Sequence, residues 1–150
     1  MGRLYNREIR FFSTGRVSMR LIAVANQKGG VGKTTTSVNL AACLATAEKK
    51  TLLIDLDPQA NATSGFGIDR KAQRPTVYEF LISGASFDQV VLREILPQLD
   101  IMPSGPALAG AQVELLQLER PEQRLRMVLG PALAPRVRVN EIALGAVLPP

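Results

Sequence analysis

The chain has 150 residues, of which 46% are hydrophobic and 21% are charged, so it is long enough and apolar enough to form one globular domain. It contains no histidine and one cysteine, Cys43, which excludes internal disulfides, CxxC metal sites and histidine-based catalysis. The net charge of +5 is concentrated in residues 1–20, because residues 21–150 carry thirteen bases and twelve acids. The basic pI therefore does not indicate a DNA-binding face on the folded part.

The first segment, residues 1–18, is rich in arginine and has no strand or helix pattern. We expect it to be a disordered basic extension. Its composition resembles an organellar transit peptide or a basic arm. The alternative, which we favour, is an extension from a start codon assigned too early, because Met19 stands directly before the first predicted strand.

A βαβ unit is predicted next in the chain. Residues 21–25 form a short apolar run, which is typical of a strand buried on both faces. A glycine-rich turn at 26–32 leads into a helix predicted over 33–47, whose many apolar residues suit packing against a sheet. Residues 51–54 form a second buried strand. We expect the two strands to be parallel and to lie beside each other in a doubly wound sheet.

The later elements are shorter. Leu108, Ala111, Leu115 and Leu118 recur at helical spacing and predict one amphipathic helix. After Gly130 the chain contains a single acid, and residues 136–139 form at most one short alternating strand. The remaining predictions are a loop over 59–75, short helices over 76–82 and 87–96, a third strand over 99–103, and a helix that starts at Pro121.

The segment KGGVGKTT, residues 28–35, lies between a predicted strand and a predicted helix, which is the context of a phosphate-binding loop. Glycines allow successive N–H groups to point at phosphate oxygens, and the helix adds the positive end of its dipole. We expect Lys33 to reach the β- and γ-phosphates, Thr34 to ligate Mg²⁺ and Thr35 to bond the α-phosphate. The alternative is a tight turn without a ligand. The predicted nucleotide-binding residues are Gly29, Gly30, Val31, Gly32, Lys33, Thr34 and Thr35.

Two carboxylates, Asp55 and Asp57, follow the second strand. Ligands of doubly wound sheets bind outside the carboxyl ends of the strands, so these residues are candidates to hold Mg²⁺-bound water and to position an attacking water. The alternative is that they only end a strand.

The loop departs from the general motif G-x-x-x-x-G-K-[ST], because position 27 is glutamine and a second lysine, Lys28, precedes the glycine pair. This pattern resembles the deviant P-loop, KGGxGKT, of the partition and cell-division ATPases, the ParA/Soj and MinD relatives. The segments TSVNLA and TSGFG and residues 99–116 resemble the partition ATPases as well. The resemblance covers about residues 20–130. It implies an α/β fold, a P-loop NTPase-like doubly wound parallel sheet of which only the N-terminal part is present.

The resemblance also implies roles for single residues. Lys28 would be the lysine that reaches the partner's phosphates in a nucleotide-sandwich dimer, so that Lys28, Lys33 and Asp57 form the catalytic set. Asp57 would position the attacking water. Asp55 would support the magnesium shell together with Thr34.

The function that this resemblance implies is chromosome or plasmid partitioning, with ATP and Mg²⁺ as cofactors. ATP would drive formation of a homodimer, a centromere-binding ParB-type partner would stimulate hydrolysis, and the intact family member would bind non-specific DNA. The protein would be cytoplasmic and nucleoid-associated, without a membrane partner. One alternative is an inactive fragment that at most binds nucleotide or pairs with a full-length paralogue. A second is a MinD-type division-site regulator, which would need a membrane-binding C-terminal helix that the final residues do not resemble.

The resemblance stops near residue 130. The family continues with a strand that ends in Asp-x-Pro-Pro, the Walker B and switch II region, whereas residues 131–150 contain no aspartate. We expect a frameshift or truncation at this point. The predicted organisation is a basic extension over 1–18, the N-terminal part of a P-loop domain over 19–130, and a tail over 131–150 that is foreign to the family. Whether such a chain hydrolyses ATP is left open by the sequence.

Overall fold

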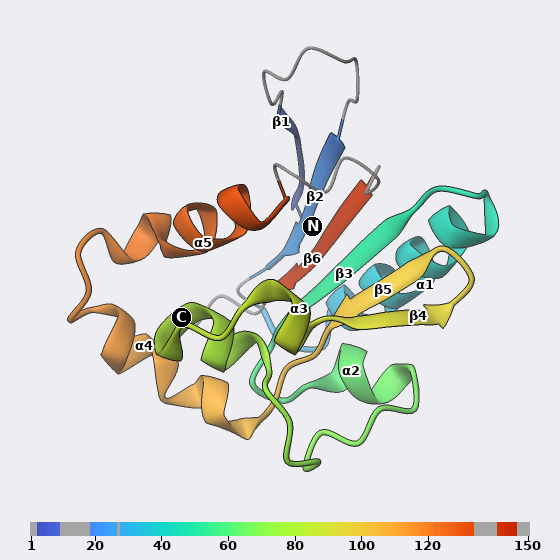
Figure 1. Cartoon of the computed structure of the whole chain (residues 1–150). Coiled ribbons are helices and arrows are strands. Elements are labelled where there is room, and N and C mark those ends of the chain that lie inside the picture. Colours follow the sequence, from blue (N-terminus) through green and yellow to red (C-terminus); the bar gives the residue numbers. More distant parts are fainter. Residues whose placement is uncertain (1–2, 10–18, 27, 134–140, 147–150) are drawn as a thin grey trace.

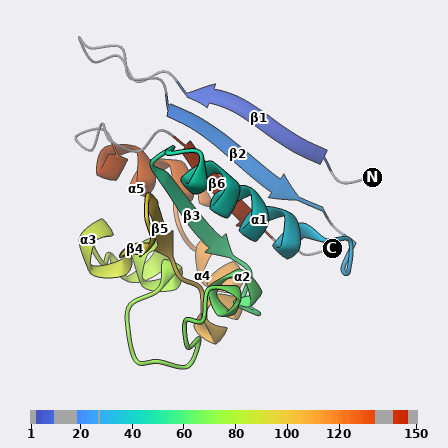
Figure 2. The same ribbon diagram turned by 90° about the vertical axis from the view of Figure 1, so that its right-hand side faces the viewer.

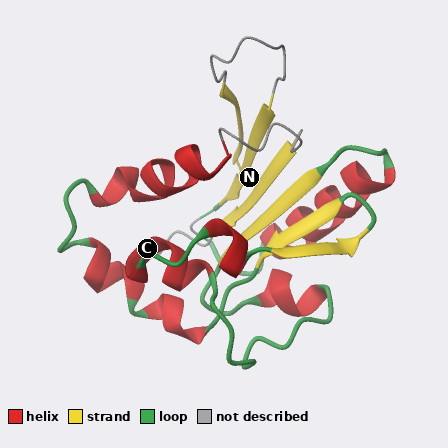
Figure 3. Ribbon diagram, viewed as in Figure 1, coloured by secondary structure: helices red, strands yellow, loops and turns green. Residues whose placement is uncertain are grey.

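Strands of the described part of the chain form one sheet, in the order β1-β2-β6-β3-β5-β4 (Figures 1 and 3). The structure is a computed structural model and describes residues 3–9, 19–26, 28–133 and 141–146. The inner strands β2, β6, β3 and β5 are parallel, whereas β1 and β4 pair antiparallel at the two edges. The strands are β1 (Arg3–Ile9), β2 (Met19–Ala25), β3 (Thr51–Leu56), β4 (Leu92–Leu96), β5 (Leu99–Met102) and β6 (Glu141–Ala146).

The helices connect these strands and cover both faces of the sheet (Figure 1). The longest is α1 (Lys33–Thr46), which connects β2 to β3. The others are α2 (Asn61–Gly65), the π-helix η1 (Glu79–Ser83), α3 (Phe87–Val90), the 3₁₀ helix η2 (Pro106–Ala109), α4 (Ala111–Leu115), the 3₁₀ helix η3 (Pro121–Gln123) and α5 (Arg124–Leu133).

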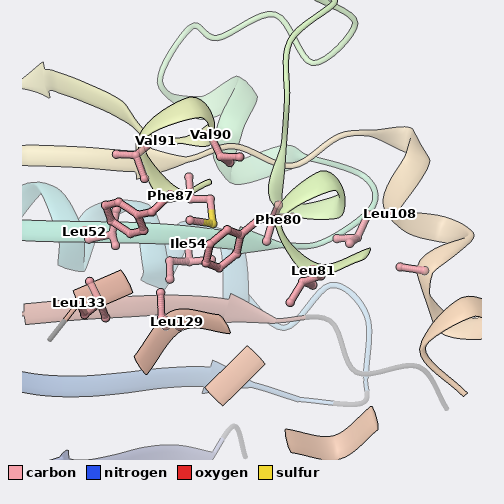
Figure 4. Packing of buried hydrophobic residues seen from close by; sticks show 13 residues of the cluster. Leu52, Ile54, Phe80, Leu81, Phe87, Val90, Val91, Leu108, Leu129 and Leu133 are labelled. Atoms are coloured by element: carbon pink, nitrogen blue, oxygen red, sulfur yellow. The ribbon is translucent and has the colours of Figure 1, made fainter. Parts of the chain in front are cut away.

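Side chains of β3 alternate between two hydrophobic clusters. Leu53 faces α1 and packs with Ala41 and Ala45, while its neighbours Leu52 and Ile54 face the opposite layer. On that second face the cluster includes Phe80, Phe87, Leu129 and Leu133 from η1, α3 and α5 (Figure 4). Burial of one such leucine or isoleucine contributes about 1.5–3 kcal/mol, so β3 stabilises the packing of both layers. Asp55 shares its face of β3 with Leu53 and therefore lies on the side of α1 and α2.

The predicted fold class is confirmed, since helices cover both faces of a sheet whose inner strands are parallel. The βαβ unit of β2, α1 and β3 is present as predicted. The expectation that its two strands lie beside each other is wrong, because β6 lies between them and pairs with both. No local pattern predicts this arrangement, because β6 is short and lies more than 80 residues after β3 in the chain.

Other elements also differ from their predictions. The helix predicted over 87–96 ends at Val90, and Leu92–Leu96 forms the edge strand β4. Leu92 and Ile95 of this strand pack against the α1-side cluster, which favours the strand over a continued helix. The single helix predicted over 108–118 is divided into η2 and α4. The sequence predicted no strand in residues 1–18, whereas Arg3–Ile9 forms β1; the possible strand at 136–139 lies outside the described residues.

Candidate functional site

At two positions of the loop between β2 and α1, the backbone has a conformation that only glycine adopts without strain. Gly30 has a φ of 68° and Gly32 a φ of 84°, both in the left-handed region. A Cβ atom built on Gly29, Gly30 or Gly32 would meet no atom within 4 Å. The glycines therefore form an open, curled segment of backbone rather than a tightly packed turn.

At the N-terminus of α1, the first N–H groups have no hydrogen-bond acceptor among the described residues. The first i→i−4 hydrogen bond is donated by the Thr36 N–H to the Gly32 carbonyl, at 2.8 Å. The N–H groups of Lys33, Thr34 and Thr35 come before that bond, and Gly32 has no side chain that caps them. The first turn of α1 also contains no acidic residue. Open N–H donors at the positive end of a helix dipole form a site for an anion, which fits a phosphate group.

The two lysines of the loop are both near this helix start. The Lys33 ammonium donates to the Lys28 carbonyl at 3.0 Å, so it lies across the loop rather than extending into solvent. The Lys28 N–H donates to the Asn26 Oδ1 at 3.1 Å, and Lys28 itself is exposed. The two predicted catalytic lysines are thus in contact, through the Lys33 ammonium and the Lys28 carbonyl.

Asp55, at the end of β3, is almost completely buried, with an exposed fraction of 1%. Its Oδ2 accepts hydrogen bonds from the Thr63 N–H at 2.8 Å and from the Thr63 hydroxyl at 2.7 Å. Its Oδ1 accepts from the Asp57 N–H at 3.1 Å. Burial raises the pKa of the Asp55 carboxyl above its ordinary value, against the lowering effect of the bonds from Thr63.

Asp57 is more accessible than Asp55. It is half-buried, and its Oδ1 accepts from the Gln59 N–H at 2.9 Å. Within the described part of the chain its carboxylate accepts no other hydrogen bond, so Oδ2 is open to another partner. Of the two aspartates, Asp57 therefore presents the carboxylate that a water or a ligand can reach.

The predicted site residues lie on the same side of the sheet, at the carboxyl ends of its parallel strands. The glycine loop follows the carboxyl end of β2 and the aspartates follow the carboxyl end of β3, and both strands run parallel to β6. Figure 2 shows the start of α1 at the same edge as the ends of β2 and β3. Because β6 separates the two strands, the loop and the aspartates face each other across one intervening strand.

The donor set for magnesium is small in this part of the protein. The described residues contain no group of three or more His, Cys, Asp or Glu side chains that could hold a metal ion. Thr34 is half-buried at the start of α1. Mg²⁺ is usually bound through one or two protein oxygens together with water and substrate phosphates, and this sparse set fits that mode of binding.

Sequence reasoning gave no role to two residues of the site. Thr63 is fully buried and bonds Asp55, and its Oγ1 also accepts from the Ser104 N–H at 3.0 Å. Ser104 follows β5 and has an exposed fraction of 1%. The sequence signal for both residues is weak. Thr63 is a small polar residue in a predicted loop, and Ser104 is one directly after a predicted strand.

In the described residues, none of the helices has the length and apolar character that crossing a bilayer requires.

Comparisons with known proteins agree on one family. A family model described as an AAA domain matches residues 19–134. The chain is 48% identical over 115 residues to the chromosome partitioning protein ParA of Myxococcus xanthus, a match that covers 77% of this chain and 41% of that protein. It is 47% identical over 110 residues to the sporulation initiation inhibitor protein Soj of Bacillus subtilis, covering 73% of this chain and 44% of that one.

A solved structure shares the fold. The cobyrinic acid a,c-diamide synthase of Mycobacterium smegmatis, crystallised with an ATP analogue and magnesium, superposes with a TM-score of 0.76 at 32% identity. That match covers 84% of this chain and 50% of the synthase. The chain thus spans less than half the length of the two curated relatives and about half of this structural neighbour.

Proposed function

We propose that the chain binds Mg-ATP at residues 28–35 and acts in DNA partitioning. The premise is its family: the chain belongs to the AAA domain family and, within it, to the ParA/Soj-type partitioning ATPases. The observation that carries this proposal is the loop itself. It combines two left-handed glycines with an uncapped start of α1, so its N–H groups are arranged for a phosphate without further folding. A solved neighbour that holds an ATP analogue and magnesium supports the same ligand class.

Each residue of the loop has a distinct task in this proposal. The N–H groups of residues 29–35 surround the phosphates, and the Thr34 hydroxyl ligates the metal. The Lys33 ammonium exchanges the Lys28 carbonyl, at 3.0 Å in the structure, for β- and γ-phosphate oxygens. Bound Mg²⁺ would neutralise charge on the phosphates and orient them. Asp57 holds the attacking water through its open carboxylate oxygen, because phosphoryl transfer needs a placed nucleophile more than a strong base.

Dimerisation is the second part of the proposal. Lys28 is exposed, so its side chain is accessible to a second nucleotide-bound copy of the chain. We infer four finer functions from the relatives of the chain: an ATP-dependent homodimer, a ParB-type centromere-binding partner, contact with non-specific DNA, and a cytoplasmic, nucleoid-associated location. Segregation of a chromosome or a plasmid is the process that these activities serve.

The test is calorimetric titration of the 150-residue chain with a non-hydrolysable ATP analogue and Mg²⁺. Lys33→Ala should abolish binding, because it removes the charge nearest the phosphates. Lys49→Ala is the matched control, since Lys49 is an exposed lysine beyond the far end of α1 and should bind as the wild type does. Equal affinity of wild type and Lys33→Ala would contradict the loop assignment.

Oligomeric state tests the role of Lys28. Lys28→Ala should keep the affinity of the monomer for nucleotide and lose the dimer that wild type forms with the ATP analogue, as measured by light scattering. A dimer that survives Lys28→Ala would contradict the sandwich arrangement. Binding without turnover in the wild type would favour the alternative of a nucleotide-binding module that lacks ATPase activity.

A further inference from the structure

A buried threonine joins two strand ends and a helix beside the proposed nucleotide site. Thr63, the third residue of α2, is completely buried. Its N–H and its hydroxyl both donate to the Asp55 Oδ2 at the end of β3. The same hydroxyl oxygen accepts from the Ser104 N–H after β5, at 3.0 Å. One side chain therefore connects α2, the end of β3 and the end of β5.

We propose that Thr63 is a positioning residue that fixes the segment carrying Asp57, and that Asp55 is the anchor for Thr63 rather than a ligand of the metal. This inference rests on the proposed function for the identity of the site. It reassigns Asp55, which sequence reasoning placed in the magnesium shell, and it adds Thr63, to which no role was given.

The hydrogen bonds of Asp55 argue against direct metal binding. Two donors from Thr63 occupy Oδ2, the Asp57 N–H occupies one position on Oδ1, and the side chain has an exposed fraction of 1%. A carboxylate oxygen offers two lone pairs, so Oδ2 has none left for a cation. Mg²⁺ also requires near-octahedral access and retains several waters, which a carboxylate enclosed in this way does not allow.

The same bonds close residues 55–63 into a ring. Asp57 donates its N–H to Asp55, Ala60 donates its N–H to the Asp57 carbonyl at 2.8 Å, and Thr63 returns to Asp55. Within this ring Ala60 has a φ of 52°, a left-handed conformation that is strained for alanine. Such strain persists only where surrounding bonds determine the backbone, and the two bonds from Thr63 are the ones that close the ring. Asp57 is held in place by that closure.

Hydrogen exchange of the nucleotide-free chain tests the inference directly. In the wild type, the amides of Thr63 and Ser104 should share one opening rate, because both bonds break when Thr63 moves. Thr63→Val keeps the shape and removes the hydroxyl, and should accelerate exchange across residues 57–64 and at Ser104 by roughly tenfold or more. Thr63→Ser should restore wild-type exchange there.

Thr51→Val is the matched control. Thr51, like Thr63, is a completely buried threonine. It is the first residue of β3, and its hydroxyl donates to the Lys49 carbonyl, at the opposite end of the strand from Asp55. This variant should change overall stability without selectively accelerating exchange in 57–64. Three results would overturn the inference: unequal opening of Thr63 and Ser104 in the wild type, unchanged exchange in Thr63→Val, or the same local acceleration in the control.

A second measurement addresses Asp55. The quantity to measure is the gain in affinity for the ATP analogue when Mg²⁺ is added. If Asp55 is an anchor, this gain should be the same within about twofold in wild type and Asp55→Asn. If Asp55 is a metal ligand, the variant should lose most of the gain. A loss of the Mg²⁺ gain in Asp55→Asn would overturn the reassignment. If the wild type binds no nucleotide, the proposed function fails, and the exchange experiment, which uses no nucleotide, still decides the role of Thr63.

Discussion

The left-handed conformation of Gly32 gives a quantitative test of whether the phosphate loop is formed before a ligand binds. Gly32 has a φ of 84°, and a Cβ there would meet no atom within 4 Å, so Gly32→Ala introduces strain without a clash. The left-handed region costs an L-residue about 1–2 kcal/mol. Gly29 also has open space around a Cβ, but its φ is not in that region, so Gly29→Ala introduces neither.

The difference between these two variants isolates the strain. Both substitutions reduce the freedom of the unfolded chain by a similar amount, about 0.4–1 kcal/mol, which cancels in the comparison. Gly32→Ala should therefore be about 1–2 kcal/mol less stable than Gly29→Ala. At about 2–4 °C per kcal/mol for a chain of this size, its Tm should be about 2–8 °C lower.

The assay is thermal unfolding of the two variants and the wild type by circular dichroism, without nucleotide. Gly29→Ala should melt at or slightly above the wild-type temperature. Equal Tm values for the two variants would refute the reasoning, because they would mean that Gly32 leaves the left-handed region when no phosphate is bound. In that case the loop would be formed by the ligand.

Two further predictions concern buried polar groups. Ser37 of α1 is fully buried and its hydroxyl has no hydrogen-bond partner among the described residues, so Ser37→Ala should stabilise the protein by about 1 kcal/mol, seen as a Tm increase. Asp100 is buried and bonds Arg93 at 2.9 Å, Lys50 at 3.3 Å and the Glu94 N–H at 2.9 Å. Asp100→Asn should destabilise the protein by about 2 kcal/mol in urea unfolding, which is below the range of about 3–5 kcal/mol for fully buried pairs because Arg93 is 45% exposed. An unchanged midpoint would contradict this.

The local elements of the site were predictable because each has a signal within a few residues. The loop at 28–35 combines its glycines, its lysines and the start of a helix in one segment, and the strand before Asp55 is an uninterrupted apolar run. Propensity and spacing determine such features, and the structure has β2, α1 and β3 where they were expected. Their roles in binding stay predictions.

The long-range features were not predictable in this way. The position of β6 between β2 and β3 depends on pairing with strands that are distant in sequence, and nothing in residues 141–146 specifies those partners. Thr63 and Ser104 are separated by 41 positions and meet only because β3 and β5 are neighbours in the sheet. For the same reason, the sequence identified Asp55 as a carboxylate at a strand end but not Thr63 as its hydrogen-bond partner.

The glycine loop and the segment after β3 differ in how their hydrogen-bonding groups are satisfied, and this difference bears on nucleotide binding and hydrolysis. The loop leaves the first N–H groups of α1 open to a phosphate, and the Lys33 ammonium can exchange its bond to the Lys28 carbonyl for one to a phosphate oxygen. The segment after β3 has the opposite character, because Asp55 and Thr63 satisfy each other and hold the backbone closed. Nucleotide binding should therefore need little rearrangement and leave the aspartate segment unchanged, and under the proposed role Asp57 would act in turnover from its fixed position. Under the proposed roles, Thr63→Val should lower hydrolysis while nucleotide binding is kept, whereas Lys33→Ala should abolish binding and any hydrolysis with it.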